Sequence, residues 1–151
     1  MANTQAMCTS FKGELLVGHH NFGTGVTRGS TAADTFKAAL YLASATVNAA
    51  TTAYSATNEV SGTGYTAGGV TVTFGTPPST SGTTAFVTPS ASISYSAVTL
   101  STAFDAVLIY NSTQSNKAVS VHTFGSQTVT AGTFTLTMPV NDASTGLIRL
   151  A

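Results

Sequence analysis

Three histidines are the first residues of this chain that could bind a metal ion. His19 and His20 are adjacent, and His122 could add a third imidazole nitrogen, the kind of ligand that zinc sites use. Adjacent side chains on a strand point to opposite faces, and no carboxylate or cysteine stands at a ligand-like spacing from either histidine. We therefore interpret the pair as loop histidines that hydrogen-bond locally, and we predict no metal and no other cofactor.

Serine chemistry would need a nucleophile, a base and an acid in one site. Asp105, His122 and one of the many serines could form a Ser-His-Asp set, but a chain this rich in serine always offers such a combination by chance. The motifs Gly-x-Ser-x-Gly, Ser-x-x-Lys and His-Glu-x-x-His are absent from the sequence. Cys8 lies in an apolar segment with no basic neighbour to lower its pKa, which indicates a small core residue. We predict no catalytic residue and therefore no enzyme.

Glycoside cleavage would need a pair of carboxylates. The five carboxylates are scattered along the chain: Glu14, Asp34, Glu59, Asp105 and Asp142. We interpret four of them as solvated loop residues rather than as a catalytic pair. Asp105 falls inside an expected strand, where an unpaired half-buried carboxylate is costly. We expect it to pair, either with Lys117 across a turn or with a neighbouring subunit.

A glycine-rich run resembles at first the fingerprint of a dinucleotide-binding loop. In Gly62-Thr-Gly-Tyr-Thr-Ala-Gly68, however, the last glycine is one position late, and no strand-to-helix unit surrounds the run. We interpret these glycines as turn residues with positive φ. The five basic residues are spread over the chain and form no patch that could follow a phosphate backbone, so no nucleic-acid partner is predicted.

The polar surface of this 151-residue chain must consist mainly of hydroxyl groups. Ten residues are charged, five of each sign, whereas Ser and Thr together number 46. Thr is β-branched and favours extended backbone, so the composition favours strands over helices. Zero net charge with so few charges suits a protein that is packed against neighbours. No apolar run approaches about 20 residues and the N-terminus has no signal-peptide pattern, so neither a membrane span nor export is expected.

The elements that would position any site are strands, organised around residues 104–124. Residues 104–111 form an apolar, β-branched run, residues 118–124 alternate between apolar and polar, and polar residues lie between the two. This pattern predicts two strands joined by a turn. Both faces of the first strand are apolar, with Leu108 on one and Ile109 on the other. We expect this strand in the middle of a sheet that a second sheet or another subunit covers.

About eight strands are expected in total, at 36–47, 70–74, 85–87, 93–97, 104–111, 118–124, 134–138 and 147–150. Turn-rich loops are expected at 48–69 and 77–83, and one short helix at 9–17, followed by a loop or extended arm. We predict an all-β fold, a single-domain, jelly-roll-like β-sandwich at 34–151. A short N-terminal helix and arm at 1–33 would precede it.

Four stretches carry a resemblance to a known family. They are Asp34-Thr-Phe-Lys-Ala-Ala-Leu-Tyr-Leu42, Asn58-Glu-Val-Ser-Gly-Thr-Gly-Tyr-Thr-Ala-Gly-Gly69, Phe104-Asp-Ala-Val-Leu-Ile-Tyr-Asn111 and Gly132-Thr-Phe-Thr-Leu-Thr-Met-Pro139. Together they resemble small virion structural proteins of tailed bacteriophages, in particular capsid decoration (cement) proteins. The resemblance implies a non-enzymatic β-domain that binds and stabilises the major capsid protein lattice and forms homo-oligomers. It also implies a place on the capsid exterior of virions assembled in the host cytoplasm.

Two alternatives stay open beside this family. A tail, fibre or head-to-tail component could use a similar short β-domain and would differ in its copy number. A carbohydrate-binding β-sandwich would have to build its sugar platform from tyrosine, because the chain has no Trp. The candidates for that platform are Tyr41, Tyr54, Tyr65, Tyr95 and Tyr110.

Partner contacts are expected at the N-terminal segment and at the loop around residue 65. The residues are Met7, Phe11, Leu15, Leu16 and Tyr65. We also expect contacts at the margins of the sheets. Unpaired strand edges must be covered or used, and few charges are available in this chain to guard them.

Overall fold

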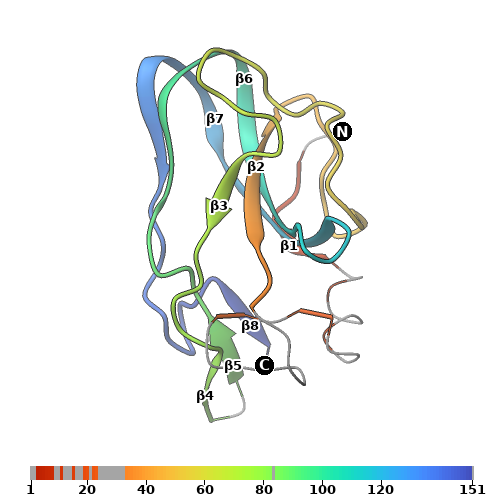
Figure 1. Cartoon of the computed structure of the whole chain (residues 1–151), viewed down its shortest axis with the longest axis vertical. Coiled ribbons are helices and arrows are strands. Elements are labelled where there is room, and N and C mark those ends of the chain that lie inside the picture. Colours follow the sequence, from red (N-terminus) through yellow and green to blue (C-terminus); the bar gives the residue numbers. More distant parts are fainter. Residues whose placement is uncertain are drawn as a thin grey trace.

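The computed structural model describes residues 3–8, 11, 15, 19–20, 22–23, 33–82 and 84–150. Within these residues, eight strands form two antiparallel sheets (Figure 1). The larger sheet has the order β1 (Ala6–Met7), β7 (Lys117–Leu136), β6 (Ile93–Asn111), β2 (Phe36–Leu42), β3 (Val70–Val72). The smaller sheet has the order β4 (Ser79–Ser81), β5 (Thr84–Val87), β8 (Ile148–Leu150). The prediction of an all-β fold with about eight strands in two sheets is confirmed, while the jelly-roll arrangement stays a prediction.

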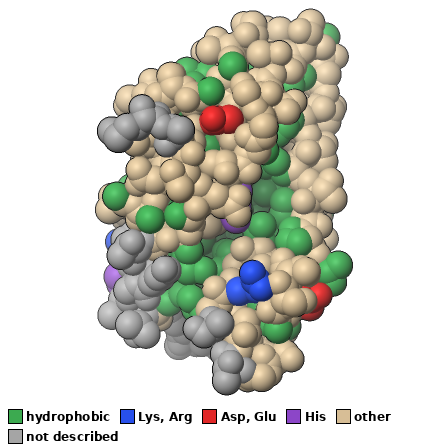
Figure 2. Space-filling view, turned by 180° about the vertical axis from the view of Figure 1, so that it is seen from behind, with side chains coloured by type: hydrophobic (Ala, Val, Ile, Leu, Met, Phe, Trp, Pro, Cys, Tyr) green, Lys and Arg blue, Asp and Glu red, His purple; other side chains and the backbone are tan. Residues whose placement is uncertain are grey.

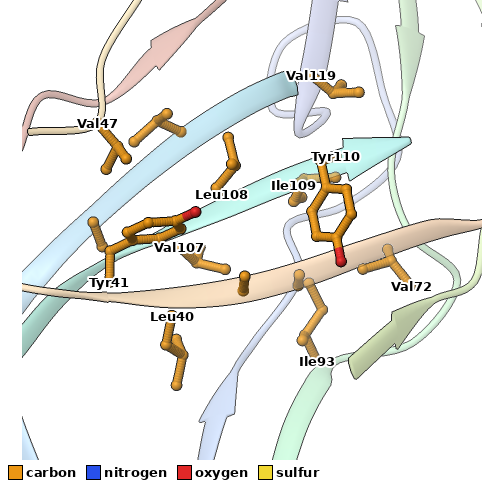
Figure 3. Packing of buried hydrophobic residues seen from close by; sticks show 14 of the residues in the cluster. Leu40, Tyr41, Val47, Val72, Ile93, Val107, Leu108, Ile109, Tyr110 and Val119 are labelled. Atoms are coloured by element: carbon orange, nitrogen blue, oxygen red, sulfur yellow. The ribbon is translucent and has the colours of Figure 1, made fainter. Parts of the chain in front are cut away.

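The second half of β6 is the centre of the larger sheet, as its apolar sequence predicts. Every residue from 106 to 111 is buried, and β2 and β7 pair with this half on either side. Figure 3 shows the packing around it, with Leu40 and Tyr41 extending to opposite sides of β2. Burying a side chain such as Leu108 or Ile109 stabilises the fold by about 1.5–3 kcal/mol, so this strand contributes much of the stability of the core.

β6 and β7 form one long hairpin that folds back on itself. They contain 19 and 20 residues and are joined by a turn at 112–116. The ring centroids of Phe124 and Phe134 lie 5.1 Å apart, although a straight strand would separate residues ten positions apart by about 33 Å. Irregularities in the β6–β7 register between Tyr95 and Ala106 accommodate this bend. Figure 1 shows both strands turning over together, so that one half of the hairpin leaves the middle of the larger sheet.

This bend corrects the prediction of separate strands. The strands expected at 93–97 and 104–111 are both parts of β6, and those expected at 118–124 and 134–138 overlap with β7. In β7 the sequence between the expected strands is mostly polar, but pairing with β6 keeps it extended; in β6 the apolar residues Val98 and Leu100 continue the strand. The loop expected at 77–83 contains β4, whose exposed Ser and Thr residues give no burial signal either. The strand expected at 36–47 ends at Leu42.

The described residues of the N-terminal segment pack onto this sandwich. β1 pairs with β7, so that Met7 lies opposite Ser120. The helix expected at 9–17 lies largely outside the described residues; Phe11 and Leu15, which are described, have helical backbone. Phe11 is fully buried, and its ring contacts that of Phe22 at 5.8 Å in an edge-on arrangement. The division of the chain at residue 33 stays a prediction.

Candidate functional site

Glu59 is the centre of the densest group of polar side chains in the described part of the chain. It lies in the loop that follows β2, and only 8% of its surface is exposed. Its Oε2 accepts a hydrogen bond from the Tyr54 hydroxyl at 2.6 Å. Its Oε1 accepts one from the Tyr65 hydroxyl at 2.7 Å and one from the Gly68 N–H at 2.8 Å. Three neutral donors therefore satisfy this buried carboxylate.

The other tyrosines of the chain extend this group. The Tyr110 ring stacks on Tyr54 with centroids 4.7 Å apart, and its hydroxyl donates to the carbonyl of Gly68 at 2.8 Å. The Tyr95 ring stacks on Tyr65 at 5.9 Å. The Tyr41 hydroxyl donates to the carbonyl of Ser55, which fixes the first part of the same loop. We call these five tyrosines together with Glu59 the tyrosine cluster.

Two tyrosine hydroxyls take the place of a missing strand at the outer edge of β2. β3 pairs only with the start of β2, and the loop residue Val60 donates its N–H to Leu40 further along. Between these two contacts, the N–H of Leu40 donates to the Tyr65 hydroxyl at 3.0 Å. The carbonyl of Ala38 accepts from the Tyr95 hydroxyl at 2.9 Å. The tyrosine cluster thus completes the backbone hydrogen bonds of β2.

Gly69 permits the close approach that this arrangement needs. Its φ is +72°, and a Cβ atom there would lie 1.7 Å from the carbonyl oxygen of Ala38. No other residue could occupy this position without displacing the loop from β2. The prediction that the glycines of the run at 62–68 act as turn residues with positive φ is confirmed for Gly64, whose φ is +78°, and for Gly68, whose φ is +89°.

The pKa values of hydroxyl groups in the tyrosine cluster are raised above the usual value for tyrosine. Burial, partly offset by the hydrogen bond to Ser55, raises the pKa of Tyr41 to about 12. Burial and the nearby Glu59 carboxylate also raise the pKa values of Tyr65 and Tyr95. Their hydroxyls therefore stay protonated donors across the neutral range, and none is tuned to act as a base there. The chemistry that this group supports is structural: it fastens the loop at 43–69 to the sheet.

The tyrosine cluster also bears on the predictions for the carboxylates and for a sugar platform. The prediction that Glu59 and Asp34 are solvated is wrong, because each is 8% exposed. Asp34 accepts a hydrogen bond from the buried Asn111 side chain at 2.7 Å. A sugar platform would need tyrosine rings on the surface, but Tyr41, Tyr95 and Tyr110 are buried and Tyr54 and Tyr65 are half-buried. Three of the five rings that the carbohydrate alternative requires are therefore buried, and this alternative stays a prediction.

The structure brings together two members of the Ser-His-Asp combination. Ser120 Oγ and His122 Nε2 lie 2.9 Å apart on β7. Burial lowers the pKa of His122 to about 4, so its ring is neutral at pH 7. Asp105 is held elsewhere, because it accepts a hydrogen bond from the Asn3 amide. Ser120 itself is only 3% exposed, which leaves a substrate no approach to its hydroxyl.

The expected pairing of Asp105 with Lys117 across the turn is wrong. Lys117 lies opposite Asn111 at the turn end of the hairpin, whereas Asp105 lies further along β6, between Phe104 and Ala106, which pair with Gln127 and Thr123. Asp105 is half-buried, as predicted, and the Asn3 amide supplies the hydrogen bond that such a position demands. The alternative partner, a neighbouring subunit, stays a prediction.

The histidines do not converge in the structure. The His20 ring packs edge-on against Phe11 at 4.7 Å, and its Nδ1 lies 3.1 Å from the Asn111 side-chain nitrogen. His122 is bonded to Ser120 instead. Among the described residues, no three His, Cys, Asp or Glu side chains come together in a way that could hold a metal ion.

The residues predicted as partner contacts occupy different environments. Phe11 is fully buried, and with the partly buried Leu15 it lines a small apolar pocket against Phe86 of β5 and Ile148 of β8. Met7 is half-buried in β1. Tyr65 is half-buried as well, and its hydroxyl is engaged by Glu59. Leu16 lies outside the described residues, and the role of the whole set stays a prediction.

The second half of β7 differs from all of these regions. Residues 128–136 pair with β6 on one side, and no strand of the described chain pairs with them on the other. Their threonine side chains are exposed. Figure 2, which shows the side opposite to the view of Figure 1, has hydrophobic side chains and a histidine in a hollow of that face, with Lys or Arg side chains below the hollow. We call residues 128–136 the open edge and take it as the candidate functional site.

Comparison with known protein families, curated proteins and solved structures finds no match for this chain. What the structure defines is a class: an all-β protein of two antiparallel sheets built on one long, bent hairpin. None of the described residues forms a helix long and apolar enough to cross a bilayer.

Proposed function

We propose that this chain is a non-enzymatic structural protein of a bacteriophage virion. Its role is that of a capsid decoration, or cement, protein that binds the major capsid protein lattice on the outside and stabilises it. The observation that carries this proposal is the open edge of β7, an uncharged row of threonines with unpaired backbone on one side. The resemblance of four sequence stretches to phage virion proteins supplies the family.

The physics of a repeated lattice supports the assignment. Weak contacts become effectively irreversible when they are multiplied over many copies, so a cement protein needs shape and edges rather than reactive groups. The tyrosine cluster supports the same role, because it fastens a long loop to the sheet and stiffens the domain. A stiff domain loses little conformational entropy when it docks on a shell.

The proposal is tested on particles that lack this protein. Particles from a deletion strain should lose their contents at a lower temperature than wild-type particles, and after a smaller reduction of the salt concentration. Adding back the purified chain should restore the resistance of the particles to heat and to low salt, whereas an unrelated small β-protein added at the same concentration should not. Particles that lack this protein but have unchanged stability and otherwise normal composition would count against the proposal.

Copy number separates this role from a tail, fibre or head-to-tail component. A cement protein repeats with the capsid lattice, so its amount should be comparable to that of the major capsid protein on a stained gel. A tail or connector protein should be present at a small fraction of that amount. Electron micrographs of particles labelled through this chain would then place it on the shell or on the tail.

A further inference from the structure

The open edge is a long stretch of strand that has no partner strand on one side in the described part of the chain. The other strands at the margins of the two sheets have only two or three residues: β1, β3, β4 and β8. Pro77 and Pro78 precede β4, and Arg149 lies within β8. Proline and charge are the usual guards of a strand edge. Along β7, by contrast, no Pro, Asp, Glu, Lys or Arg occurs after Lys117.

A bulge places the threonines of the open edge on one face. Ala131 has φ +45°, and its N–H donates to Thr99 Oγ1 at 3.0 Å, which marks the irregularity in the β6–β7 register. In a regular strand, odd- and even-numbered residues lie on opposite faces. Because the bulge shifts this phase, the exposed residues are Thr128 and Thr130 before it, Ala131 at the bulge, and Thr133 and Thr135 after it.

We propose that the open edge pairs, antiparallel, with the open edge of a second copy about a two-fold axis between Ala131 and Gly132. In this register Thr128 lies opposite Thr135 of the second copy, and Thr130 lies opposite Thr133 of the second copy. Threonine pairs across neighbouring strands are favourable. Val129 lies opposite Phe134 of the second copy on the other face, and aromatic–β-branched pairs are favourable too.

The open edge itself argues for a second copy as its occupant. A two-fold contact needs a self-complementary surface, and this register pairs like with like at all four threonines. An edge without charged side chains meets its own copy without electrostatic repulsion. The two bulges meet at the axis, so neither copy has to straighten its strand. The result is one continuous sheet through both copies.

This inference rests on the self-association that forms part of the proposed function, and it identifies the open edge as the surface through which two copies associate. The particle experiments and the solution experiment below can nevertheless fail separately. A chain that dimerises through the open edge but is absent from particles would contradict the virion role alone. A monomer in solution that stabilises particles would contradict the dimer alone.

The test measures the mass of the purified full chain by sedimentation velocity and light scattering over a range of concentrations. We expect a dimer for the natural sequence. In the double variant Thr130→Lys and Thr133→Lys, each lysine faces a lysine of the second copy, so the dimer dissociation constant should rise by about tenfold or more. The matched control Thr57→Lys changes an exposed threonine of the loop at 43–69 and should leave the dimer intact.

A charge-swap experiment tests the register. The double variant Thr130→Glu and Thr133→Glu should also be monomeric alone, but mixing it with the lysine variant should restore a mixed dimer, because each Lys then faces a Glu. Recovery of the dimer also shows that both variants are folded. A natural chain that stays monomeric at every concentration would overturn the proposal, and so would a lysine variant that dimerises as before. Folded charge variants that do not form the mixed dimer would overturn the register.

Discussion

The tyrosine cluster and the open edge of β7 solve the same problem, an incomplete strand edge, in opposite ways. At β2 the chain fills the gap from within: the Tyr65 hydroxyl bonds to Leu40, beyond the end of β3, and the Tyr95 hydroxyl bonds to Ala38, where the β3 pairing ends. At β7 the outer backbone of nine residues has no strand partner in the described chain. The polar side chains of the first region stabilise the monomer, whereas the backbone of the second is the surface that we propose for assembly. Substitutions in the two regions should therefore have separable effects.

Removing the carboxylate of Glu59 is expected to have the largest effect. Glu59→Ala leaves the hydroxyls of Tyr54 and Tyr65 and the N–H of Gly68 without their acceptor, and unsatisfied buried donors are costly. We expect a loss of about 4 kcal/mol in the free energy of unfolding. Urea unfolding followed by tyrosine fluorescence measures this loss.

The matched variant for this prediction is Glu59→Gln. It keeps the size and one acceptor oxygen but presents an amide N–H₂ to one of the donors, so roughly 2 kcal/mol should be lost. An alanine variant within about 1 kcal/mol of the natural chain would show that the tyrosine cluster is not what fastens the loop.

Acid should weaken the fold through His122, which lies on the first half of β7. Burial lowers its pKa to about 4 from the usual 6.5, so between these values the unfolded chain binds a proton that the folded chain does not. Stability from this source is complete above pH 6.5 and falls as the pH is lowered towards 4, by up to about 3 kcal/mol. Unfolding curves measured at several pH values should show this slope. The variant His122→Gln should lose it, and an unchanged slope would assign the effect to other groups.

The sequence predicted the elements that carry apolar periodicity and missed those that carry none. The doubly apolar run at 104–111 and the alternating run at 118–124 are β-strands joined by a turn, and Pro89 does separate two strands. The bend of the hairpin could not be predicted, because the contact between Phe124 and Phe134 is a tertiary one. β4 could not be predicted either, since its three residues are all exposed and extended only by pairing with β5.

The tyrosine cluster was not predicted from the sequence, for a different reason. Glu59 stands among turn residues, where a carboxylate is ordinarily solvated, and nothing local shows that the loop is fastened to β2. A signal was present in the spacing: Tyr54 and Tyr65 flank Glu59 five and six positions away, and both donate to it. The expectation that sheet margins are contact surfaces was available from composition, but the identity of the open edge depends on the order of the strands.

Single hydroxyls of the tyrosine cluster should have intermediate effects. Tyr95→Phe removes the hydroxyl that donates to the carbonyl of Ala38, and the loss of this buried hydrogen bond should cost about 1–2 kcal/mol. Phenylalanine keeps the ring contacts of Tyr95, so the variant and the natural chain differ in the hydrogen bond and not in packing. Hydrogen exchange should also quicken at the amides of β2 that lie beside this carbonyl. A variant as stable as the natural chain would mean that water replaces the hydroxyl there.

The open edge should give the smallest effect on the stability of the monomer. Thr133 is exposed, and its side chain makes no hydrogen bond within the described chain, so Thr133→Lys should change the free energy of unfolding by no more than about 0.5 kcal/mol. The same change at Thr88 is the matched comparison, because that side chain is 3% exposed and its Oγ1 accepts the N–H of Leu147 at 2.9 Å. Thr88→Lys should cost at least about 2 kcal/mol. Both values come from denaturation at a protein concentration low enough to keep the chain monomeric. If Thr133→Lys were as damaging as Thr88→Lys, the open edge would belong to the fold of the monomer, and the separation of stability from assembly in this molecule would not hold.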